Sequence, residues 1–515
     1  MKIDRREMLR STAGTLAVAA TPLWLPATVA DAADKLKTEG NNVMQGYFEE
    51  NFGVGPELIR KTLSIALQSG GEYAEIFLQH RVRDSIGFED GRVNDASVNV
   101  DLGAGVRVLV GDQTGYAFTE DLSPQALAKA ATTAASIARK SPTDRPLEFN
   151  RVEIPDLYPR QRVWLDVPAK EKLALASTVG EKILAGDPSM IKANVRVQNE
   201  DEVLLVANTA GDWVEDTRPL TRIYATAVAE KDGRRESYLH RISARRGIDY
   251  YAGSQLDDFV KHLVARALQQ FEATQPPAGA MPVVLAPGTS GILLHEAMGH
   301  GFEADFNRKG VSIYSNMMGK KIAADFVTIY DSGTIANERG AISVDDEGTP
   351  GKETVLVKDG RLVSYLHDRI SSQQLKTEPT GNGRRQSFRY APIPRMRVTA
   401  MAAGPHDPEE IIKSVKRGIY AENFSNGQVM IGAGDYSFYL RSGYLIEDGK
   451  LTQPIKDANL IGNGPDTLLD TVMVGNDMEL AQDGGTCGKD GQWVPVGVGI
   501  PTVKVSSITV GGVNS

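Results

Sequence analysis

The chain has 515 residues, which is too long for a single typical hydrophobic core and predicts two domains with additional segments. Its hydrophobic fraction of 41% and charged fraction of 24% are those of a water-soluble globular protein. The formal net charge of −9 argues against binding of nucleic acid or of anionic membranes, because both need a local excess of Lys and Arg.

The first 32 residues resemble a secretory signal peptide. A basic start precedes an apolar run over about residues 12–29, and small residues follow it. Arg5 and Arg6 resemble the pair of a twin-arginine signal, although the residues around them depart from its commonest form, so Sec export is the alternative. We predict a periplasmic or otherwise exported protein. After cleavage of residues 1–32 no segment is long and apolar enough to cross a bilayer.

Helices are predicted where a capping residue or a first-turn proline opens a segment of helical periodicity. These segments are 56–69, 124–140, 168–185, 255–271 and 408–417. Alternating apolar and polar residues between them predict strands, as in 98–111, 201–218 and 221–234. The sequence therefore predicts an α+β fold.

Asp-Gly pairs followed by Arg or Lys mark four predicted hairpin turns, because the pair accepts the positive φ angles of a two-residue turn. They are Asp90-Gly91, Asp232-Gly233, Asp359-Gly360 and Asp448-Gly449. Antiparallel sheet should dominate, with few helices after residue 310. The Pro- and Gly-rich segment 273–282 is the predicted domain boundary. We expect an N-terminal α/β domain over 50–275 and a β-rich C-terminal domain over 282–515.

The stretch GILLHEAMGHGFEADF, residues 291–306, is the strongest sign of chemistry. It places His295 and His300 five positions apart on a predicted helix entering the core, with Glu296 directly after the first. Zinc motifs usually space such histidines four apart, so that both reach one ion. Five positions correspond to about 140° around an ideal helix. A single π-bulge would return both rings to one face, and Gly299 and Gly301 would let the helix loosen there.

A catalytic zinc site needs a third protein ligand and one open position. Glu303, Asp305 and Cys487 are the candidates. Glu303 shares a helix face with His300, whereas Cys487 lies in the glycine-rich stretch GGTCGKDGQW, which can bring a thiolate to a distant helix. Cys487 is the single cysteine of the chain, and on its own it would be interpreted as a buried inert thiol.

Five ordered blocks together resemble the TldD/PmbA metalloprotease family, also called modulator of DNA gyrase. They are HEAMGHGFEADF, DDEGTPGKETVLVKDGRLVSYLHD, GNGRRQSFRYAPIPRM, LIGNGPDTLLDTVMVGND and CGKDGQWVPVGVGIPTVKVSSITVGG. The resemblance spans about residue 50 to the C-terminus and is closer to the TldD side, because PmbA-like paralogues lack the histidine motif.

The resemblance implies Zn²⁺ held by His295, His300 and Cys487, with Glu296 as the catalytic carboxylate. It also implies that residues 282–515 form the metalloprotease domain, with a metal-binding helix. The site would be enclosed in a homodimer, or in a heterodimer with a PmbA-like paralogue, and would hydrolyse unfolded or small peptides. The export signal departs from the best-known members, which are cytoplasmic. The alternatives are a metal-dependent amidase for small substrates and a non-catalytic partner subunit of a protease.

Several other polar residues are weaker candidates. His367 could donate to an oxyanion, although a polar strand end is the more frequent role of such a residue. Arg384, Arg385, Arg389 and Arg395 could clamp a substrate carboxylate, or could form a solvated loop. The acidic run at 345–347 could orient a ligand histidine, although such runs are more often turns. His80, His240, His262 and His406 are expected to be structural or exposed.

Overall fold

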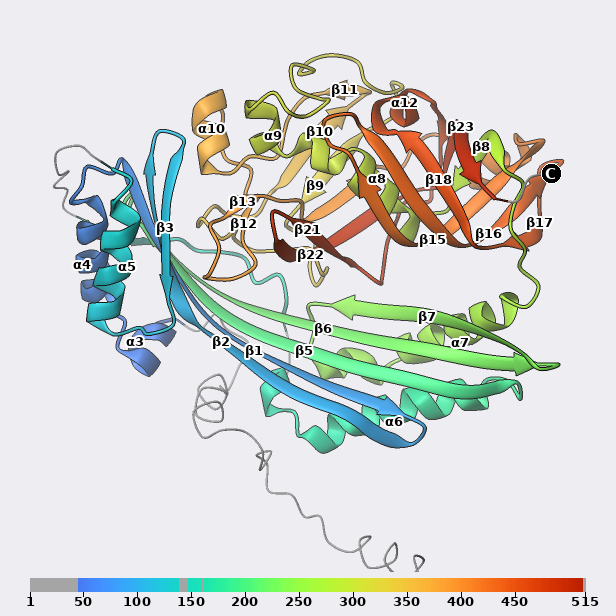
Figure 1. The fold of residues 1–515 in the computed structure, drawn as a ribbon, viewed down its shortest axis with the longest axis horizontal. Coiled ribbons are helices and arrows are strands. Elements are labelled where there is room, and N and C mark those ends of the chain that lie inside the picture. Colours follow the sequence, from blue (N-terminus) through green and yellow to red (C-terminus); the bar gives the residue numbers. More distant parts are fainter. Residues whose placement is uncertain (1–44, 139–146, 160–161, 513–515) are drawn as a thin grey trace, which may run out of the picture.

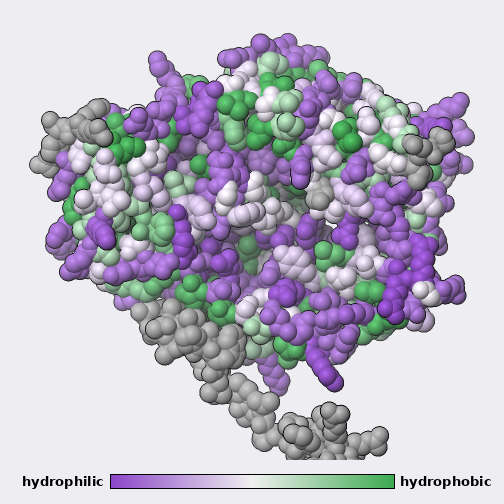
Figure 2. All heavy atoms as spheres, in the orientation of Figure 1, coloured by the Kyte–Doolittle hydropathy of each residue, from purple (hydrophilic) through white to green (hydrophobic). Residues whose placement is uncertain are grey.

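The structure is a computed structural model that describes residues 45–138, 147–159 and 162–512. The predicted signal peptide, residues 1–32, lies outside the described residues. The described part combines helices with long strands, which confirms the predicted α+β class. None of its helices has the length and apolar character needed to cross a membrane. Figure 2 shows one face of the molecule, on which hydrophilic side chains predominate and hydrophobic ones lie in separate groups.

A long, largely antiparallel sheet forms the frame of the N-terminal part (Figure 1). Its order in the described chain is β3-β2-β1-β5-β6-β4, with β7 paired to β6. The strands are β1 (Tyr73–Glu89), β2 (Arg92–Val110), β3 (Gln113–Thr119), β4 (Asn150–Arg151), β5 (Met190–Asn208), β6 (Asp212–Lys231) and β7 (Arg234–Ala244). The four longest have 17 to 20 residues, so each spans roughly 60 Å at the usual rise of a strand.

Two groups of helices cover this sheet and form separate apolar cores. One core lies between β1, β2 and the helices α3, α4 and α5, and the other lies between β5–β7 and the helices α6 and α7. The elements are α3 (Tyr47–Phe52), α4 (Pro56–Leu67), α5 (Pro124–Ala135), η1 (Trp164–Asp166), α6 (Ala169–Ala185), η2 (Ile248–Ala252) and α7 (Gln255–Gln269). Figure 1 shows α6 and α7 on the face of the long sheet that is turned away from the C-terminal part.

Two further sheets make up most of the C-terminal part of the described chain. One has the order β15-β8-β23-β18-β16-β17, with β19 on β23, and the pairing of β15 with β16 closes it into a ring. Its strands are β8 (Gly279–Leu285), β15 (Arg417–Val429), β16 (Asp435–Glu447), β17 (Lys450–Ile455), β18 (Ala458–Asn463), β19 (Thr471–Val474) and β23 (Val503–Gly511). This ring supports the helix that carries His295, because that helix contacts β15 and β16.

The other sheet has the order β11-β10-β9-β14-β22-β20, with β21 on β22. Its strands are β9 (Ile329–Ser332), β10 (Glu353–Lys358), β11 (Arg361–Leu362), β14 (Val398–Met401), β20 (Glu479–Leu480), β21 (Gly485–Lys489) and β22 (Gln492–Ile500). A small pair is formed by β12 (Gly383–Arg384) and β13 (Ile393–Pro394). The hairpin of β21 and β22 carries Cys487 towards the histidines.

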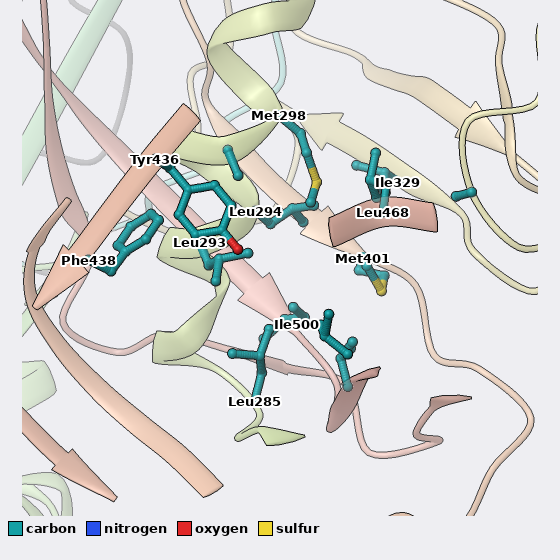
Figure 3. Close-up of a cluster of buried hydrophobic side chains, with 14 of the residues drawn as sticks. Leu285, Leu293, Leu294, Met298, Ile329, Met401, Tyr436, Phe438, Leu468 and Ile500 are labelled. Atoms are coloured by element: carbon teal, nitrogen blue, oxygen red, sulfur yellow. The ribbon is translucent and has the colours of Figure 1, made fainter. Parts of the chain in front are cut away.

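Helical elements of the C-terminal part are short. They are η3 (Thr289–Gly291), α8 (Ile292–Ala297), η4 (Gly299–Phe302), α9 (Ala304–Arg308), α10 (Arg369–Leu375), α11 (Pro408–Lys413) and α12 (Gly464–Leu469). Beyond residue 310 the described helices have six or seven residues each and are few, as the sequence predicted. Figure 3 shows Leu293, Leu294 and Met298 inserted among buried side chains that include Ile329 and Tyr436. Burial of these side chains fixes α8 in the core.

The predicted helices and turns are largely confirmed. Each predicted helix is present, although α5 ends at Ala135 and α11 at Lys413, earlier than expected. All four Asp-Gly pairs have positive φ at both residues and join paired strands. Asp490-Gly491 forms a fifth such turn, between β21 and β22. In the predicted boundary region, α7 ends at Gln269 and β8 begins at Gly279.

Buried ion pairs join the N-terminal sheet to the C-terminal part. Arg107 on β2 contacts both Glu75 on β1 and Glu347 at 2.7 and 2.5 Å, and all three side chains are fully buried. Arg218 on β6 pairs with Asp346 at 2.7 Å. Asp345 accepts hydrogen bonds from three backbone amides. The acidic run therefore forms a turn, the more frequent of its two expected roles, with Gly348 N–H donating to the Asp345 carbonyl. Asp346 and Glu347 join the two parts of the protein rather than orient a ligand histidine.

Candidate metal centre

The helix that carries His295 stops before it reaches His300. Helix α8 ends at Ala297, Met298 has φ −131° and ψ −46°, and the chain continues as the 3₁₀ turn η4. The predicted π-bulge is therefore wrong, because the two histidines belong to two short helical segments rather than to one widened helix. The break removes the angular objection to a spacing of five, since the two rings are positioned by separate turns.

Gly299 and Gly301 serve close packing rather than unusual backbone angles. Neither has positive φ. A Cβ on Gly299 would lie 2.1 Å from the sulfur of Met396, and one on Gly301 would lie 2.6 Å from the ring of Tyr314. The motif thus needs glycine on both sides of His300 because the core approaches the backbone directly.

His295, His300 and Cys487 converge on one point. One potential ligand atom from each lies within 4.8 Å of those of the other two, and all three residues are buried. The Cys487 Sγ lies 3.3 Å from His300 Nε2, and the two imidazole rings are perpendicular, with centroids 5.1 Å apart. In the described part of the chain this is the group of His, Cys, Asp or Glu side chains with a geometry suited to a metal ion.

The same strand supplies Cys487 and a buried cation. Alternate residues of a strand point to one face, so β21 directs both Cys487 and Lys489 towards the histidine segment. Lys489 Nζ donates to Glu303 at 3.0 Å and to Asp305 at 2.8 Å. Arg395 donates to the carbonyl oxygen of Cys487 at 2.6 Å. Two of the proposed alternative ligands, Glu303 and Asp305, are therefore held by Lys489.

Glu303 lies behind His300 rather than beside the cluster. Its Oε2 is 2.9 Å from His300 Nδ1, whereas the other ring nitrogen, Nε2, faces Cys487. A carboxylate on the far nitrogen fixes the tautomer and orientation of a ligand histidine, and it raises the basicity of that ligand. Glu303 is fully buried, and sequence reasoning did not identify this role for it or for Lys489.

Glu296 faces an open cavity next to the three residues. The cavity has a volume of about 320 Å³ and is lined by His295, Glu296 and Cys487, among others. The Oε2 atom of Glu296 lies 3.7 Å from His300 Nε2, the nitrogen that faces Cys487, and the side chain keeps 19% of its exposure. Burial raises the pKa of Glu296 above its usual value. A proton acceptor of raised basicity thus stands beside the cluster, in contact with the cavity.

The charges of the cluster are strongly coupled. Burial alone would raise the pKa of the Cys487 thiol, but His295 and His300 hold it well below its usual range. Burial alone would lower the pKa of His300, whereas Glu303 and Cys487 raise it well above its usual range. Although burial opposes ionisation of Glu303, Lys489 and His300 lower its pKa to about 2. The two histidines therefore favour the thiolate form of Cys487, which is the form that binds metals.

The donor set fits a zinc ion. His295 is 1% exposed, and its ring nitrogens have no partner of regular hydrogen-bond geometry among the described residues apart from its contact with the Cys487 thiol. A buried imidazole without other partners is costly unless a metal supplies the missing interaction. Two imidazoles and one thiolate also match the protein ligands of a catalytic zinc site, which keeps one further position open.

Apart from Arg395, which contacts the Cys487 carbonyl, the other candidate residues bind groups outside the cluster. His367 Nδ1 is 3.3 Å from Ser371 Oγ, in contact with α10. The four predicted arginines between residues 384 and 395 bind groups of the protein itself. Arg384 donates to a main-chain carbonyl, for example, and Arg385 donates to the Glu75 carboxylate. His80 is fully buried against Tyr47. His240 and His262, which the sequence predicted to be structural or exposed, have ring centroids 4.6 Å apart.

A buried cluster of two histidines and a cysteine, beside a carboxylate and a cavity, is typical of a metal-dependent enzyme. Comparison with known families agrees. The chain matches the PmbA/TldA metallopeptidase C-terminal domain over residues 278–512, domain 1 over 74–138 and the central domain over 162–271. The chain belongs to this family, which confirms the resemblance found in the sequence.

Individual relatives support the same assignment. A metalloprotease TldD homolog of Buchnera aphidicola is 37% identical over 456 residues, which cover 86% of this chain and 93% of that protein. A zinc metalloprotease TldD homolog of Saccharolobus solfataricus is 33% identical over 258 residues, half of this chain and 57% of that protein. The crystal structure of TldE from Thermococcus kodakarensis is similar with a TM-score of 0.68, at 17% identity over 88% of this chain and 99% of that one.

Proposed function

We propose that the chain is a zinc-dependent peptidase that hydrolyses peptide bonds of unfolded or small peptides, with His295, His300 and Cys487 as the zinc ligands. The observation that carries this proposal is the convergence of three buried ligand atoms within 4.8 Å beside a cavity. The name of the Saccharolobus relative supports zinc as the metal. When bound, zinc supplies Lewis-acid chemistry that polarises a carbonyl and makes water more acidic.

Glu296 is the proposed general base and acid. Its carboxylate lies in the cavity and next to the ligand cluster, so it can take a proton from the attacking water and pass it to the leaving amine. The raised pKa of Glu296 brings its basicity closer to the working pH, which favours both transfers. Glu303 and Lys489 take no part in the transfer and hold His300 in place.

The proposal includes a partner and a location. Glu296 keeps part of its exposure in the single chain, so an enclosed site requires a second subunit over the cavity, either a second copy or a PmbA-like paralogue. Residues 1–32 are proposed to export the protein to the periplasm. Neither nucleic acid nor a membrane is a proposed partner, given the net charge of −9 and the helices of the described residues.

The test compares two variants of the purified protein on unfolded casein and on dipeptide amides. Glu296→Gln keeps the ligands and the shape of the side chain, so zinc should stay bound while cleavage falls by about 10² to 10⁴. His295→Ala should lose metal and activity together, because one of three protein ligands is missing. Cleavage of the amides alone would favour the small-substrate amidase. A Glu296→Gln protein of near wild-type rate would remove Glu296 from the mechanism.

A further inference from the structure

Two buried arginines next to the candidate metal centre have only neutral partners. Arg222 on β6 is 8% exposed and donates to the Tyr224 hydroxyl at 2.6 Å and to the Gly484 carbonyl at 3.1 Å. Arg339, in the loop after β9, is 5% exposed and donates to the Gly485 carbonyl at 2.9 Å and to the Thr486 hydroxyl at 3.2 Å. Among the described residues neither arginine forms an ion pair within 4.0 Å, and Arg222 Nε has no partner.

Arg222 lines the cavity at the metal centre, and both arginines line a second cavity that shares Arg222 and Thr486 with the first. Arg222 lines the cavity of about 320 Å³ that also contains Glu296 and Cys487. It also lines an adjoining cavity of about 440 Å³, together with Arg339. Thr486, the residue before Cys487, lines both cavities and lies within hydrogen-bond distance of both guanidinium groups. The two arginines therefore contact Thr486, which directly precedes the proposed ligand Cys487 in the sequence.

Arg222 and Arg339 differ from the other arginines that line the two cavities, because Arg83, Arg196 and Arg241 each form an ion pair with a carboxylate. Arg241 also lines the metal cavity, but it pairs with Asp483 at 3.3 Å. Glu200 lines the adjoining cavity without contacting either arginine within 4.0 Å. Burial, reinforced by Arg241, lowers the pKa of Arg222, and burial with Arg222 lowers that of Arg339 well below its usual range. Burial is the main cause in each case, and Asp483 near Arg222 and Glu200 near Arg339 offset it only in part.

We propose that Arg222 and Arg339 form an anion-binding subsite that holds a carboxylate of the peptide substrate while the scissile bond lies at the metal centre. This inference rests on the proposed peptidase function and narrows its substrates to peptides with a suitably placed carboxylate. A guanidinium keeps its charge at every physiological pH, and a buried charge is costly unless it is paired. Carboxylate is the anion that a peptide carries, and the planar fork of arginine matches it in two hydrogen bonds.

The carboxylate has two sources, the C-terminus and an Asp or Glu side chain. Four fluorescein-labelled forms of one unstructured octapeptide separate them: a neutral peptide with a free C-terminal acid, the same peptide as an amide, and two amides with a single internal Glu or Gln. Binding is measured by fluorescence anisotropy on zinc-loaded Glu296→Gln protein, which should retain peptide without cleaving it. Cleavage of the same four peptides is measured on the wild-type protein.

The acid should bind more tightly than its amide, or the Glu peptide more tightly than the Gln peptide, by roughly tenfold to a hundredfold, the range of a hydrogen bond between charged groups. In Arg222→Gln that ratio should fall towards one. Arg235→Gln should keep it, because Arg235 lies on β7, is 70% exposed and pairs with Glu230. The four peptides are compared on protein that keeps Arg222. That comparison therefore stands even if Arg222→Gln does not fold.

Each outcome has one meaning. A preference for the acid assigns the subsite to the C-terminal carboxylate, and a preference for the Glu peptide assigns it to a side chain. Equal binding and cleavage of all four peptides would overturn the subsite while leaving the peptidase function intact. A ratio unchanged by Arg222→Gln in a folded protein would overturn it as well. Absence of both binding and cleavage for every peptide would instead reject the peptidase function.

Discussion

The identity of the third ligand can be decided by changing the two side chains that flank His300. Cys487 and Glu303 contact opposite nitrogens of that ring, Sγ at 3.3 Å from Nε2 and Oε2 at 2.9 Å from Nδ1. In our proposal Cys487 is a ligand and Glu303 orients the ligand histidine. Cys487→Ser should therefore lower zinc affinity more than Glu303→Gln does.

The expected magnitudes follow from these roles. Loss of a partner that orients a ligand histidine costs about 10- to 100-fold in metal affinity, or about 1.4 to 2.8 kcal/mol. Zinc in a four-ligand site is bound with about 10 to 16 kcal/mol, so the share of one ligand is roughly 2.5 to 4 kcal/mol, up to several hundredfold. Asp305→Asn is the matched control, because Asp305 also contacts Lys489 and forms no hydrogen bond to a histidine.

Zinc affinity is measured by competition with a chromophoric chelator, and zinc content is measured after dialysis at a fixed free-zinc concentration. Circular dichroism checks that each variant is folded. Asp305→Asn should change affinity less than Glu303→Gln. The reasoning would be refuted if Cys487→Ser kept wild-type zinc, or if Glu303→Gln lost as much zinc as Cys487→Ser. The second result would make Glu303 itself a ligand.

Three further predictions concern stability, location and assembly. Burial raises the pKa of Glu338 to about 7, so the contribution of Glu338 to stability falls as the pH rises from about 4.5 to 7. Glu338→Gln should therefore raise the free energy of unfolding by on the order of 2 kcal/mol at pH 8 and by little at pH 4. Equal shifts in melting temperature at both pH values would contradict this. Intact-mass measurement of the native protein should show a mature chain that starts near residue 31 or 33, and a full-length mass would end the export proposal. Light scattering should show a dimer, and a stable, active monomer would reject the enclosed two-subunit site.

Local signals in the sequence were sufficient for most of the fold. The Asp-Gly turns and the capped helices depend on residues adjacent in the chain, and the structure places them as predicted. The histidine motif is also a local signal, because its residues lie within six positions, although its two histidines lie on separate turns. By contrast, the break at Met298 was not foreseen, and neither was the close approach of Met396 and Tyr314 to the two glycines. That approach is a property of the packed core and leaves no local pattern.

The support of the candidate site depends on contacts between distant segments. Lys489 reads as a loop lysine in CGKDGQ, yet β21 turns it inward beside Cys487, and it neutralises Glu303 on a segment 186 residues away. The period of two along a strand would have placed Lys489 on the face of Cys487, had β21 been recognised as a strand. Nothing in the sequence, however, indicated that this face meets Glu303.

The acidic run at 345–347 shows the converse, because residues that suggested a role at the metal centre pair with Arg107 and Arg218 of the N-terminal sheet. Buried charges need partners wherever they lie, so an acidic residue in a conspicuous motif can serve assembly of the fold as readily as chemistry.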